Sequence, residues 1–307
     1  MKGELLMAEF LATPWALMPE RLNALTAVLG RWNRGQPAGD DVLTQVMADR
    51  EARQIKRQMT QSTGGAGIAV LPLYGIVTQR ANMVDDVSGP GVTSTQMFGA
   101  ALRQALADDS VGQILIDIDS PGGSVYGVAE LADQIQSARA SKPVVAIANS
   151  LAASAAYWIG CAAGEFYVTP GGEVGSIGVW QAHFDYSQAI AAEGVTPTLI
   201  SAGKYKVEGN PYEPLNDEAR GFMQSRVDDY YGAFTKAVAK GRGLPVASVR
   251  DGLGQGRVLG ADTAVGQKMV DGISTFDDLI SMMQKRGRAQ SRATSRLSQA
   301  RNALALI

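Results

Sequence analysis

The sequence predicts an α/β fold in which β/α units stack side by side with mainly parallel strands. Apolar, strand-like runs begin at Gly67 and alternate with helical segments along most of the remaining chain. Such alternation favours parallel strands joined by right-handed crossovers. The chain has 307 residues, of which 46% are hydrophobic, so it can bury a sizeable core without help.

The predicted elements follow one another in a regular order. We expect strands at 67–78, 112–119, 143–149, 165–170, 176–180 and 197–203. We expect helices at 94–109, 128–140, 216–243 and 261–270.

Composition divides the chain into three parts. Residues 1–65 form an arm that we expect to be helical and polar, because 19–32 is an amphipathic segment that opens with proline and a charged stretch follows it. The core domain then spans 66–283. Residues 284–307 form a basic tail with six Lys or Arg and no acidic residue, either helical or disordered. This tail is either a solvated end or a tether to an acidic partner or nucleic acid.

Charge and cysteine usage exclude several classes of protein. A formal net charge of −2 gives no global attraction to nucleic acid or to an anionic membrane. Cys161 is the single cysteine, so no internal disulfide can form, and we expect a buried structural thiol. Glu4 and Glu9 interrupt the apolar N-terminus, which predicts neither a secretion signal nor a membrane span. We therefore expect a soluble, intracellular protein without a membrane anchor.

Three short segments could carry chemistry. The first is DSPGGS at 119–124, which directly follows an apolar strand. A proline and two glycines there predict a tight turn whose backbone N–H groups can approach a ligand closely. An ordinary strand-to-helix turn explains the same residues.

The second segment is NSLAASAAYWIG at 149–160, where a strand end runs into a helix of small residues. Ser154 falls near the predicted helix N-terminus, where free N–H groups and the helix dipole stabilise negative charge. Small neighbours leave room for a substrate backbone. Close packing of an alanine-rich helix is the alternative explanation.

The third segment is SAGKYKVEGNPYEP at 201–214, which holds two lysines in a loop bounded by Gly and Pro. Both lysines could simply be solvated. His183 is the only histidine, however, and nothing around it marks it as a catalytic base. A neutral lysine is then the leading base, provided that burial or a like charge such as Lys204 lowers its pKa from about 10.4.

Together with GEVGSIGV at 172–179, these segments make the sequence resemble the signal peptide peptidase A family of serine peptidases. The resemblance covers about residues 67–275 and is strongest to the phage branch of head-maturation, or capsid assembly, proteases. It implies a Ser-Lys dyad in which Ser154 is the nucleophile and Lys206, rather than Lys204, is the base.

The resemblance also implies the roles of further residues. Ser176 would orient the lysine amine. The backbone N–H groups of Gly123, or its neighbour Gly122, and of Ala155 would stabilise the oxyanion. We expect no cofactor and no metal. Small neighbours around Ser154 predict a preference for small apolar residues at P1, the residue before the cleaved bond.

The fold implied by the resemblance is the Clp protease/crotonase-like spiral of repeated ββα units, whose subunits assemble into homo-oligomers that can be rings. The implied substrates are scaffold, portal or capsid proteins that are trimmed during procapsid maturation, with self-cleavage near the termini. The implied location is the host cytoplasm or procapsid interior. Members that work at membranes carry an N-terminal anchor, and many phage members continue into a long scaffold segment; we expect neither feature here.

Three other functions remain open at this stage. A crotonase-like acyl-CoA enzyme would share the fold, although such enzymes usually rely on Glu or Asp as acid and base. A catalytically idle procapsid protein would have no need for Ser154, Ser176 and Lys206 together. A cytosolic signal-peptide or quality-control peptidase would use the same chemistry on other substrates.

Overall fold

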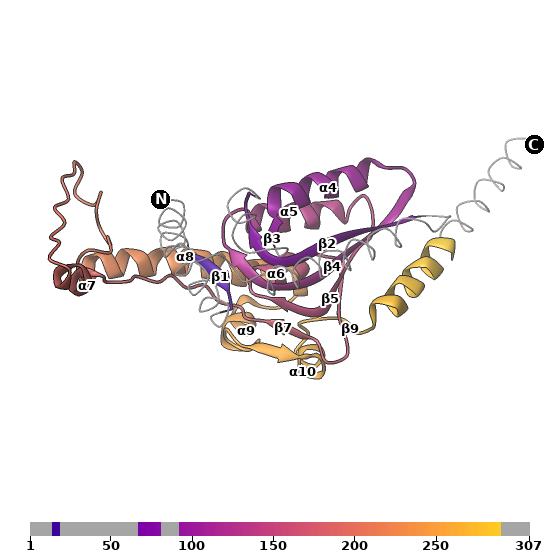
Figure 1. Cartoon of the computed structure of the whole chain (residues 1–307). Helices are drawn as coiled ribbons and strands as arrows, with labels where there is room; N and C mark the ends of the chain where they lie inside the picture. Colours follow the sequence, from indigo (N-terminus) through magenta and orange to yellow (C-terminus); the bar gives the residue numbers. More distant parts are fainter. Residues whose placement is uncertain (1–13, 19–66, 81–91, 290–307) are drawn as a thin grey trace, which may run out of the picture.

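The computed structural model describes residues 14–18, 67–80 and 92–289. Most of the N-terminal arm and the end of the basic tail lie outside the described residues. The described part contains one mixed sheet with helices packed against it and a long arm that projects from one end (Figure 1).

The centre of the sheet is parallel, as the sequence predicts. Its strand order is β3-β2-β4-β5-β6-β9. The strands along this path are β2 (Gly67–Thr78), β3 (Val92–Ser94), β4 (Val111–Ser124), β5 (Val144–Ala153), β6 (Glu165–Val168) and β9 (Gly272–Ile273). Strands β4 and β5 are central and mostly buried, which is typical of parallel strands that are covered on both faces.

Helices α4 (Thr95–Ala107) and α5 (Val128–Ala138) lie together over one face of the sheet (Figure 1). They bury one apolar side each against the strands, in a cluster that also holds α6 (Ala155–Gly160). Ser94 caps α4 by accepting a hydrogen bond from Met97 N–H. This main hydrophobic cluster fixes the carboxyl ends of β4 and β5, where the sequence places the candidate site.

The opposite face of the sheet is covered near the C-terminus of the described chain. Residues 276–289 are helical. Leu279 and Met283 from this helix pack on Leu115, Val145 and Ile147 of β4 and β5. The helix therefore runs across the expected boundary at residue 283 and continues into the first part of the basic tail.

Two short strands and two short helices complete the body. They are β7 (Glu173–Gly175), α9 (Val246–Asp251), β8 (Val258–Gly260) and α10 (Ala261–Gly266). Strand β7 pairs parallel with the end of β5 and antiparallel with β8.

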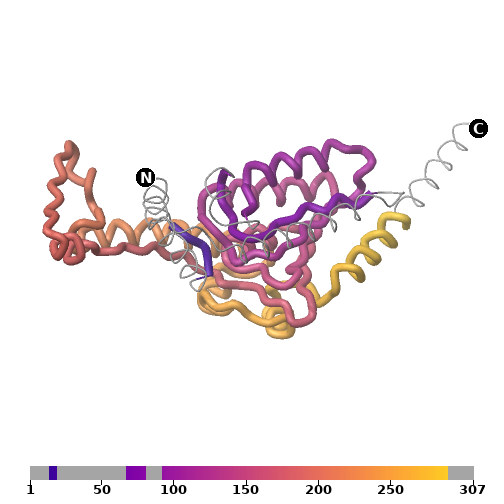
Figure 2. Tube along the Cα trace, viewed as in Figure 1, coloured from indigo at the N-terminus to yellow at the C-terminus, as the bar shows by residue number. Residues whose placement is uncertain are grey.

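The projecting arm is a different segment from the N-terminal arm of residues 1–65. It is built from α8 (Asp217–Arg242), α7 (Ser187–Ala192) and the loop between them, and it is called the arm from here on. The C-terminal half of α8 packs on the body through Phe234 and Val238, whereas its N-terminal half extends away from it (Figure 2). Helix α7 and the loop lie at the far end.

Two predicted strands are wrong. Residues 176–179 have no strand partner, and only Trp180 forms an isolated bridge. Residues 197–203 are exposed irregular chain in the arm, where Ile200 is 96% exposed. The apolar residues of 197–203 are therefore not buried within this chain. Sequence periodicity alone cannot distinguish an apolar run that is buried in a sheet from one that is exposed in the single chain.

The N-terminal arm also differs from expectation where the structure describes it. Residues Trp15–Leu17 form a buried strand, β1, instead of a helix. Pro14 and Pro19 flank this strand in the sequence and disfavour helical continuation on both sides. The helix expected at 19–32 lies outside the described residues.

Candidate active site

Ser154 lies at the sharp turn between β5 and α6. Its φ of 56° and ψ of −119° are unusual for a residue with a side chain, and the turn is stabilised by two backbone bonds. Ser154 N–H donates to the Gly175 carbonyl at 2.7 Å, and the Ser154 carbonyl accepts from Trp158 N–H at 2.9 Å. Strain of this kind is concentrated at functional sites, where neighbouring structure stabilises it.

The Ser154 hydroxyl has no hydrogen-bond partner among the described residues. Ser154 is 1% exposed, and of the buried side-chain polar atoms in that part of the chain only its Oγ and Trp158 Nε1 are unpaired. A buried hydroxyl without a partner costs about 1–3 kcal/mol. A buried, unpaired hydroxyl at a strained turn is typical of a reactive group that is positioned to contact a ligand.

The two glycines of the first segment lie directly against this turn. A methyl group on Gly122, whose φ is +100°, would lie 2.8 Å from Ser154 Cβ. A methyl group on Gly123 would lie 1.9 Å from the Val77 carbonyl oxygen. Neither position can hold a side chain. Because both residues are glycines, the backbone of β4 can lie directly against the turn that carries Ser154.

Ala155 and Ser176 complete the group around the turn. Ala155 is the first residue of α6, so its N–H has no intrahelical acceptor. Ser176 follows Gly175, is 6% exposed, and donates its N–H to the Arg257 carbonyl at 2.7 Å. The structure thus brings together Ser154, Ala155, Ser176, Gly122 and Gly123.

Lys206 is not part of this group within one chain. It lies exposed in the arm, and its backbone N–H bonds to the Gly203 carbonyl at 3.1 Å in a local turn. The arm segment that carries it is separated from α6 by the length of the projecting part of α8 (Figures 1 and 2). Within the single chain, Lys206 does not lie beside Ser154, so the Ser-Lys dyad that the resemblance implies would need the lysine of another copy.

Lys204 has a different environment. Its Nζ donates to Tyr205 Oη at 2.7 Å and to Glu218 Oε1 at 2.9 Å. These two hydrogen bonds raise the pKa of Lys204 above its ordinary value, which keeps the amine protonated. A general base has to be neutral, so this environment opposes that role for Lys204.

His183 and Cys161 do not contribute to the site. His183 Nε2 lies 3.0 Å from the Asn210 carbonyl, in the segment that leads to the arm. Cys161 is buried, as expected, and its Sγ contacts the Trp158 carbonyl at 3.1 Å. Burial raises the pKa of this thiol to about 12, which makes it an inert structural residue.

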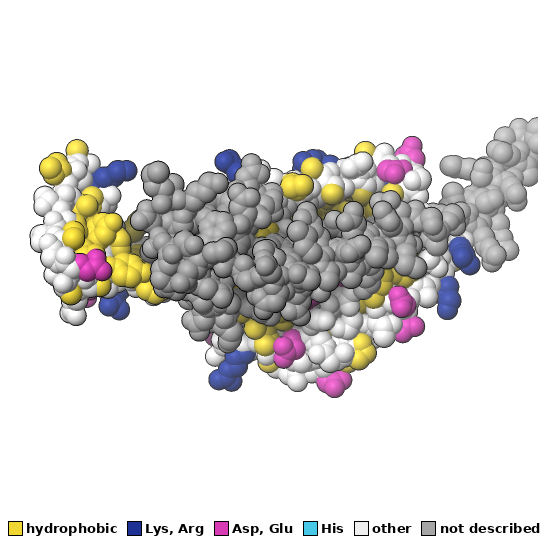
Figure 3. Space-filling model, viewed as in Figure 1, with side chains coloured by type: hydrophobic (Ala, Val, Ile, Leu, Met, Phe, Trp, Pro, Cys, Tyr) yellow, Lys and Arg dark blue, Asp and Glu magenta, His cyan; other side chains and the backbone are white. Residues whose placement is uncertain are grey.

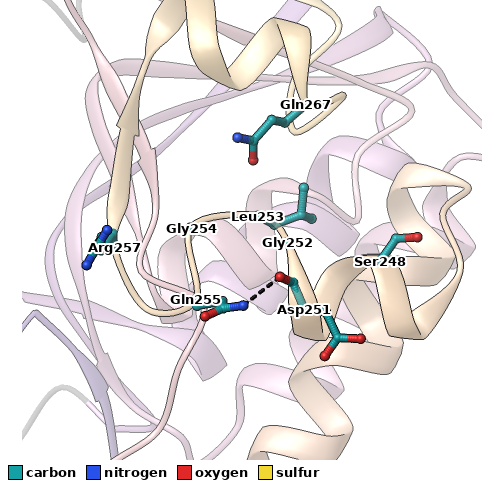
Figure 4. Close-up of a pocket in the computed structure, with 8 residues that line it drawn as sticks. All are labelled: Ser248, Asp251, Gly252, Leu253, Gly254, Gln255, Arg257 and Gln267. Carbon is teal, nitrogen blue, oxygen red and sulfur yellow. Dashed lines mark hydrogen bonds between the residues drawn. The ribbon is translucent and has the colours of Figure 1, made fainter.

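A surface pocket lies near the site without containing it (Figure 4). Its lining residues are Ser248, Asp251, Gly252, Leu253, Gly254, Gln255, Arg257 and Gln267. The pocket loop is hydrogen-bonded to the site through the Arg257 carbonyl, which accepts from Ser176 N–H. Ser154 is not among the residues that line the pocket, so we do not assign the chemistry to it.

Sequence reasoning missed two participants at the edge of the site. Strand β1 pairs with the glycine-rich end of β4, and Trp180 bonds to β1 from its other side. The signal that could have identified β1 is the PWALMP run at 14–19, because its flanking prolines favour an extended conformation.

The fold and the site together define a class: α/β proteins with a serine at a strand-to-helix turn, opposite a glycine-rich strand end. The Clp protease family model matches residues 92–173, which include β4, α5, β5 and Ser154. The model for peptidase family S49 matches residues 136–290. The chain belongs to peptidase family S49, and the Clp protease-like fold expected from the sequence is confirmed.

Curated relatives agree with this assignment. The chain is 38% identical to the capsid assembly protease C of Escherichia phage lambda over 71% of this chain and 49% of that protein. It is 38% identical to the head-tail preconnector protein of Enterobacteria phage P21 over 71% of this chain and 42% of that protein. The chain thus spans about half the length of these phage relatives.

Cellular proteases are also similar. A Methanocaldococcus jannaschii protein named as a protease is 31% identical over 72% of this chain and 71% of its own length. The resemblance to signal peptide peptidase A and to phage capsid assembly proteases is confirmed by these matches. Within the described residues, no helix combines the length and apolarity that crossing a membrane requires.

Proposed function

We propose that the protein is a serine endopeptidase in which Ser154 is the nucleophile. One observation supports this most strongly: in the part of the chain that the structure describes, the Ser154 Oγ is buried without a partner, at a strained turn that touches Gly122. The residues around it would supply the backbone donors that peptide hydrolysis needs. The N–H groups of Gly123, or Gly122, and of Ala155 would stabilise the oxyanion of the tetrahedral intermediate.

The proposed reaction has two steps. Ser154 Oγ attacks the peptide carbonyl carbon while the neutral Lys206 amine takes the hydroxyl proton. The C–N bond then breaks, and the lysine returns the proton to the leaving amine. Water, activated by the same amine, hydrolyses the acyl-enzyme. Ser176, which is adjacent to Ser154, would accept or donate a hydrogen bond to hold the amine in position.

Lys206 would come from a neighbouring copy of the chain. The arm exposes large apolar side chains, which Figure 3 shows gathered at the end of the molecule that α7 occupies. Those in the arm are Tyr186, Val195, Leu199, Ile200, Tyr205, Tyr212 and Phe222. Monomeric soluble proteins rarely expose such a concentration of apolar surface, which marks an interface. A head-to-tail contact that buries this surface can supply a lysine to each neighbouring serine.

The proposed substrates are scaffold, portal or capsid proteins in a phage procapsid or in the host cytoplasm. The named functions of the phage lambda and phage P21 relatives support this class of substrate. We propose that residues 66–283, together with the rest of the helix over 276–289, form the peptidase unit. Small apolar residues are the proposed P1 preference because alanines and glycines surround Ser154.

Mass spectrometry of the assembled protein with candidate capsid and scaffold proteins tests the function. Ser154→Ala should abolish cleavage, because loss of a catalytic serine lowers turnover by about 10⁴-fold or more. Ser150→Ala is the matched control, since Ser150 lies in β5, the strand that leads to Ser154, and also has a positive φ, of 105°. Cleavage that survives Ser154→Ala unchanged would refute the proposal.

A further inference from the structure

Strand β1 is hydrogen-bonded on both of its edges. On one edge it runs antiparallel to the end of β4, with Trp15 opposite Ser124, Ala16 opposite Gly123 and Leu17 opposite Gly122. On the other edge, Trp15 and Trp180 exchange two backbone bonds of 2.9 Å each. Trp180 Nε1 also donates to the Leu17 carbonyl at 2.8 Å. The short strand is therefore inserted in a groove that has a backbone wall on each side.

The register places Ala16 against the nucleophile. Met18 N–H bonds to the Pro121 carbonyl at 3.1 Å, and Val125 N–H bonds to the Pro14 carbonyl at 3.3 Å. Bonded pairs alternate along an antiparallel ladder, so Ala16 and Gly123 fall at the bonded position between these two. Gly123 N–H is one of the proposed oxyanion donors.

A second distance supports the same placement. A methyl group on Gly122 would lie 2.3 Å from the Ala16 carbonyl oxygen and 2.8 Å from Ser154 Cβ. Because the Ala16 carbonyl oxygen and Ser154 Cβ are both this close to the same methyl position, they lie within about 5 Å of each other. The Ala16 carbonyl thus occupies the place beside Ser154 that a scissile carbonyl has to reach.

The side chains of the strand also fit a peptide groove. Trp15, Ala16 and Leu17 are 8%, 0% and 1% exposed. Ala16 belongs to the main hydrophobic cluster, so its methyl group is enclosed by apolar neighbours. A groove that encloses a methyl group at this position has the small apolar preference proposed for P1.

We infer that the groove between Gly122–Ser124 and Trp180 binds extended peptides by strand addition, and that residues 14–18 occupy it as an internal, substrate-like strand. This inference rests on the proposed function and extends it, because Ala16 takes the P1 position and the strand excludes other peptides while it is bound. A covalently attached strand competes at an effective concentration on the order of millimolar. Peptide substrates therefore gain access only when this strand leaves.

The single chain explains why such a strand can remain intact. Its carbonyl lies beside Ser154, but Lys206 lies in the arm, away from that serine. A nucleophile without its base is weak. The internal strand therefore protects the site before assembly supplies the lysine.

A reversible disulfide tests the occupancy. Trp15 and Ser124 form a non-hydrogen-bonded antiparallel pair, whose Cα atoms are typically about 4.5 Å apart, within the range that a disulfide spans. Trp15→Cys with Ser124→Cys should lock the strand in the groove when the protein is oxidised. The native Cys161 is buried and does not interfere.

Binding of a dye-labelled peptide with the sequence of residues 12–20 is measured by fluorescence anisotropy, in full-length protein that also carries Ser154→Ala. The oxidised protein should bind at least about tenfold more weakly than the same protein after reduction. The single variants Trp15→Cys and Ser124→Cys should show no such response. Equal binding by the oxidised and reduced double variant would overturn the inference.

A second variant releases the strand without a disulfide. Ala16→Asp places a carboxylate where no side chain is exposed, so the strand should leave and the peptide should bind at least about tenfold more tightly than to the Ala16 parent. Unchanged affinity in a folded variant would count against the inference, and the disulfide pair decides the matter if this variant does not fold. Because Ser154→Ala removes turnover, these binding results stand even if peptidase activity is absent. Conversely, if oxidation of the double variant does not weaken peptide binding while the wild-type chain hydrolyses peptides normally, the inference of an internal strand is rejected and the proposed peptidase function is not.

Discussion

Gly122 and Ser154 approach so closely that no side chain fits between them: a Cβ on Gly122 would lie 2.8 Å from the Cβ of Ser154. The φ of Gly122 is also +100°, a conformation that side chains disfavour. The contact fixes the end of β4 against the turn that carries the proposed nucleophile. It also holds the Gly123 N–H, which is paired with Ala16 in the ladder, at the position where a substrate carbonyl would bind.

Gly122→Ala should therefore reduce peptide cleavage by at least about 100-fold, an effect as large as that of losing one oxyanion-hole donor. The added methyl group would point at Ser154 and at the position of the Ala16 carbonyl, so it displaces the reacting groups. Cleavage rates on a peptide with alanine at P1 provide the measurement.

Gly171→Ala is the matched control for this substitution. Gly171 also has a positive φ, of +76°, but a methyl group there would meet nothing within 4 Å. It should cost about 1 kcal/mol of stability from backbone strain and leave cleavage nearly unchanged. Equal activity in the two variants would show that the contact between Gly122 and Ser154 has no role in catalysis.

Much of this arrangement could be predicted from local sequence patterns. The strand over 67–78 has the predicted bounds, and Ser154 lies at the predicted strand-to-helix junction. Both follow from short-range periodicity and from the positions of glycine and small residues. The arm could not be predicted in this way, because its apolar residues, Ile200 above all, are exposed in the single chain. Strand β1 was missed because its partners, Gly123 and Trp180, are more than 100 residues away in the sequence.

The two lysines of the arm should respond differently to substitution. Lys206→Ala should abolish cleavage, because the proposed base is lost. Lys204→Ala should retain most activity, since this amine is already bonded to Glu218 and Tyr205 and its pKa is raised. Rates measured for both variants at the same assembly state give the comparison. Loss of activity in Lys204→Ala with full activity in Lys206→Ala would assign the base to the other lysine.

The ion pair between Arg242 and Asp271 should make stability depend on pH. Arg242 Nη2 lies 2.7 Å from Asp271 Oδ1, and the Arg242 side chain is 6% exposed. Burial opposes ionisation of Asp271, but hydrogen bonds from Arg242 and Phe166 N–H outweigh it and lower the pKa of this carboxyl. The folded pKa is below the unfolded value of about 3.9, so the stabilisation is present above that pH and is lost as the pH falls through the folded pKa.

Asp271→Asn should lower the free energy of unfolding by about 2 kcal/mol at pH 7, less than for a fully buried pair because Asp271 is partly exposed. The difference from wild type should shrink below about pH 4. Urea denaturation from pH 3 to pH 7 provides the measurement. Asp229→Asn is the control, because Asp229 is 71% exposed in its pair with Arg226 and should change stability by less than about 0.5 kcal/mol. A constant difference across this pH range would contradict the assigned role of the Asp271 carboxylate.

Mixing two inactive variants tests whether Lys206 acts on the serine of another copy. Ser154→Ala and Lys206→Ala are each expected to be inactive alone, but a mixed assembly can place the intact serine of one chain beside the intact lysine of its neighbour. Random head-to-tail mixing in equal amounts restores both residues at about a quarter of the sites, so about a quarter of the wild-type rate should return. The chains must be dissociated and reassembled together, and mixing without dissociation serves as the control. If serine and lysine came from the same chain, every site would still lack one of them and no activity would return.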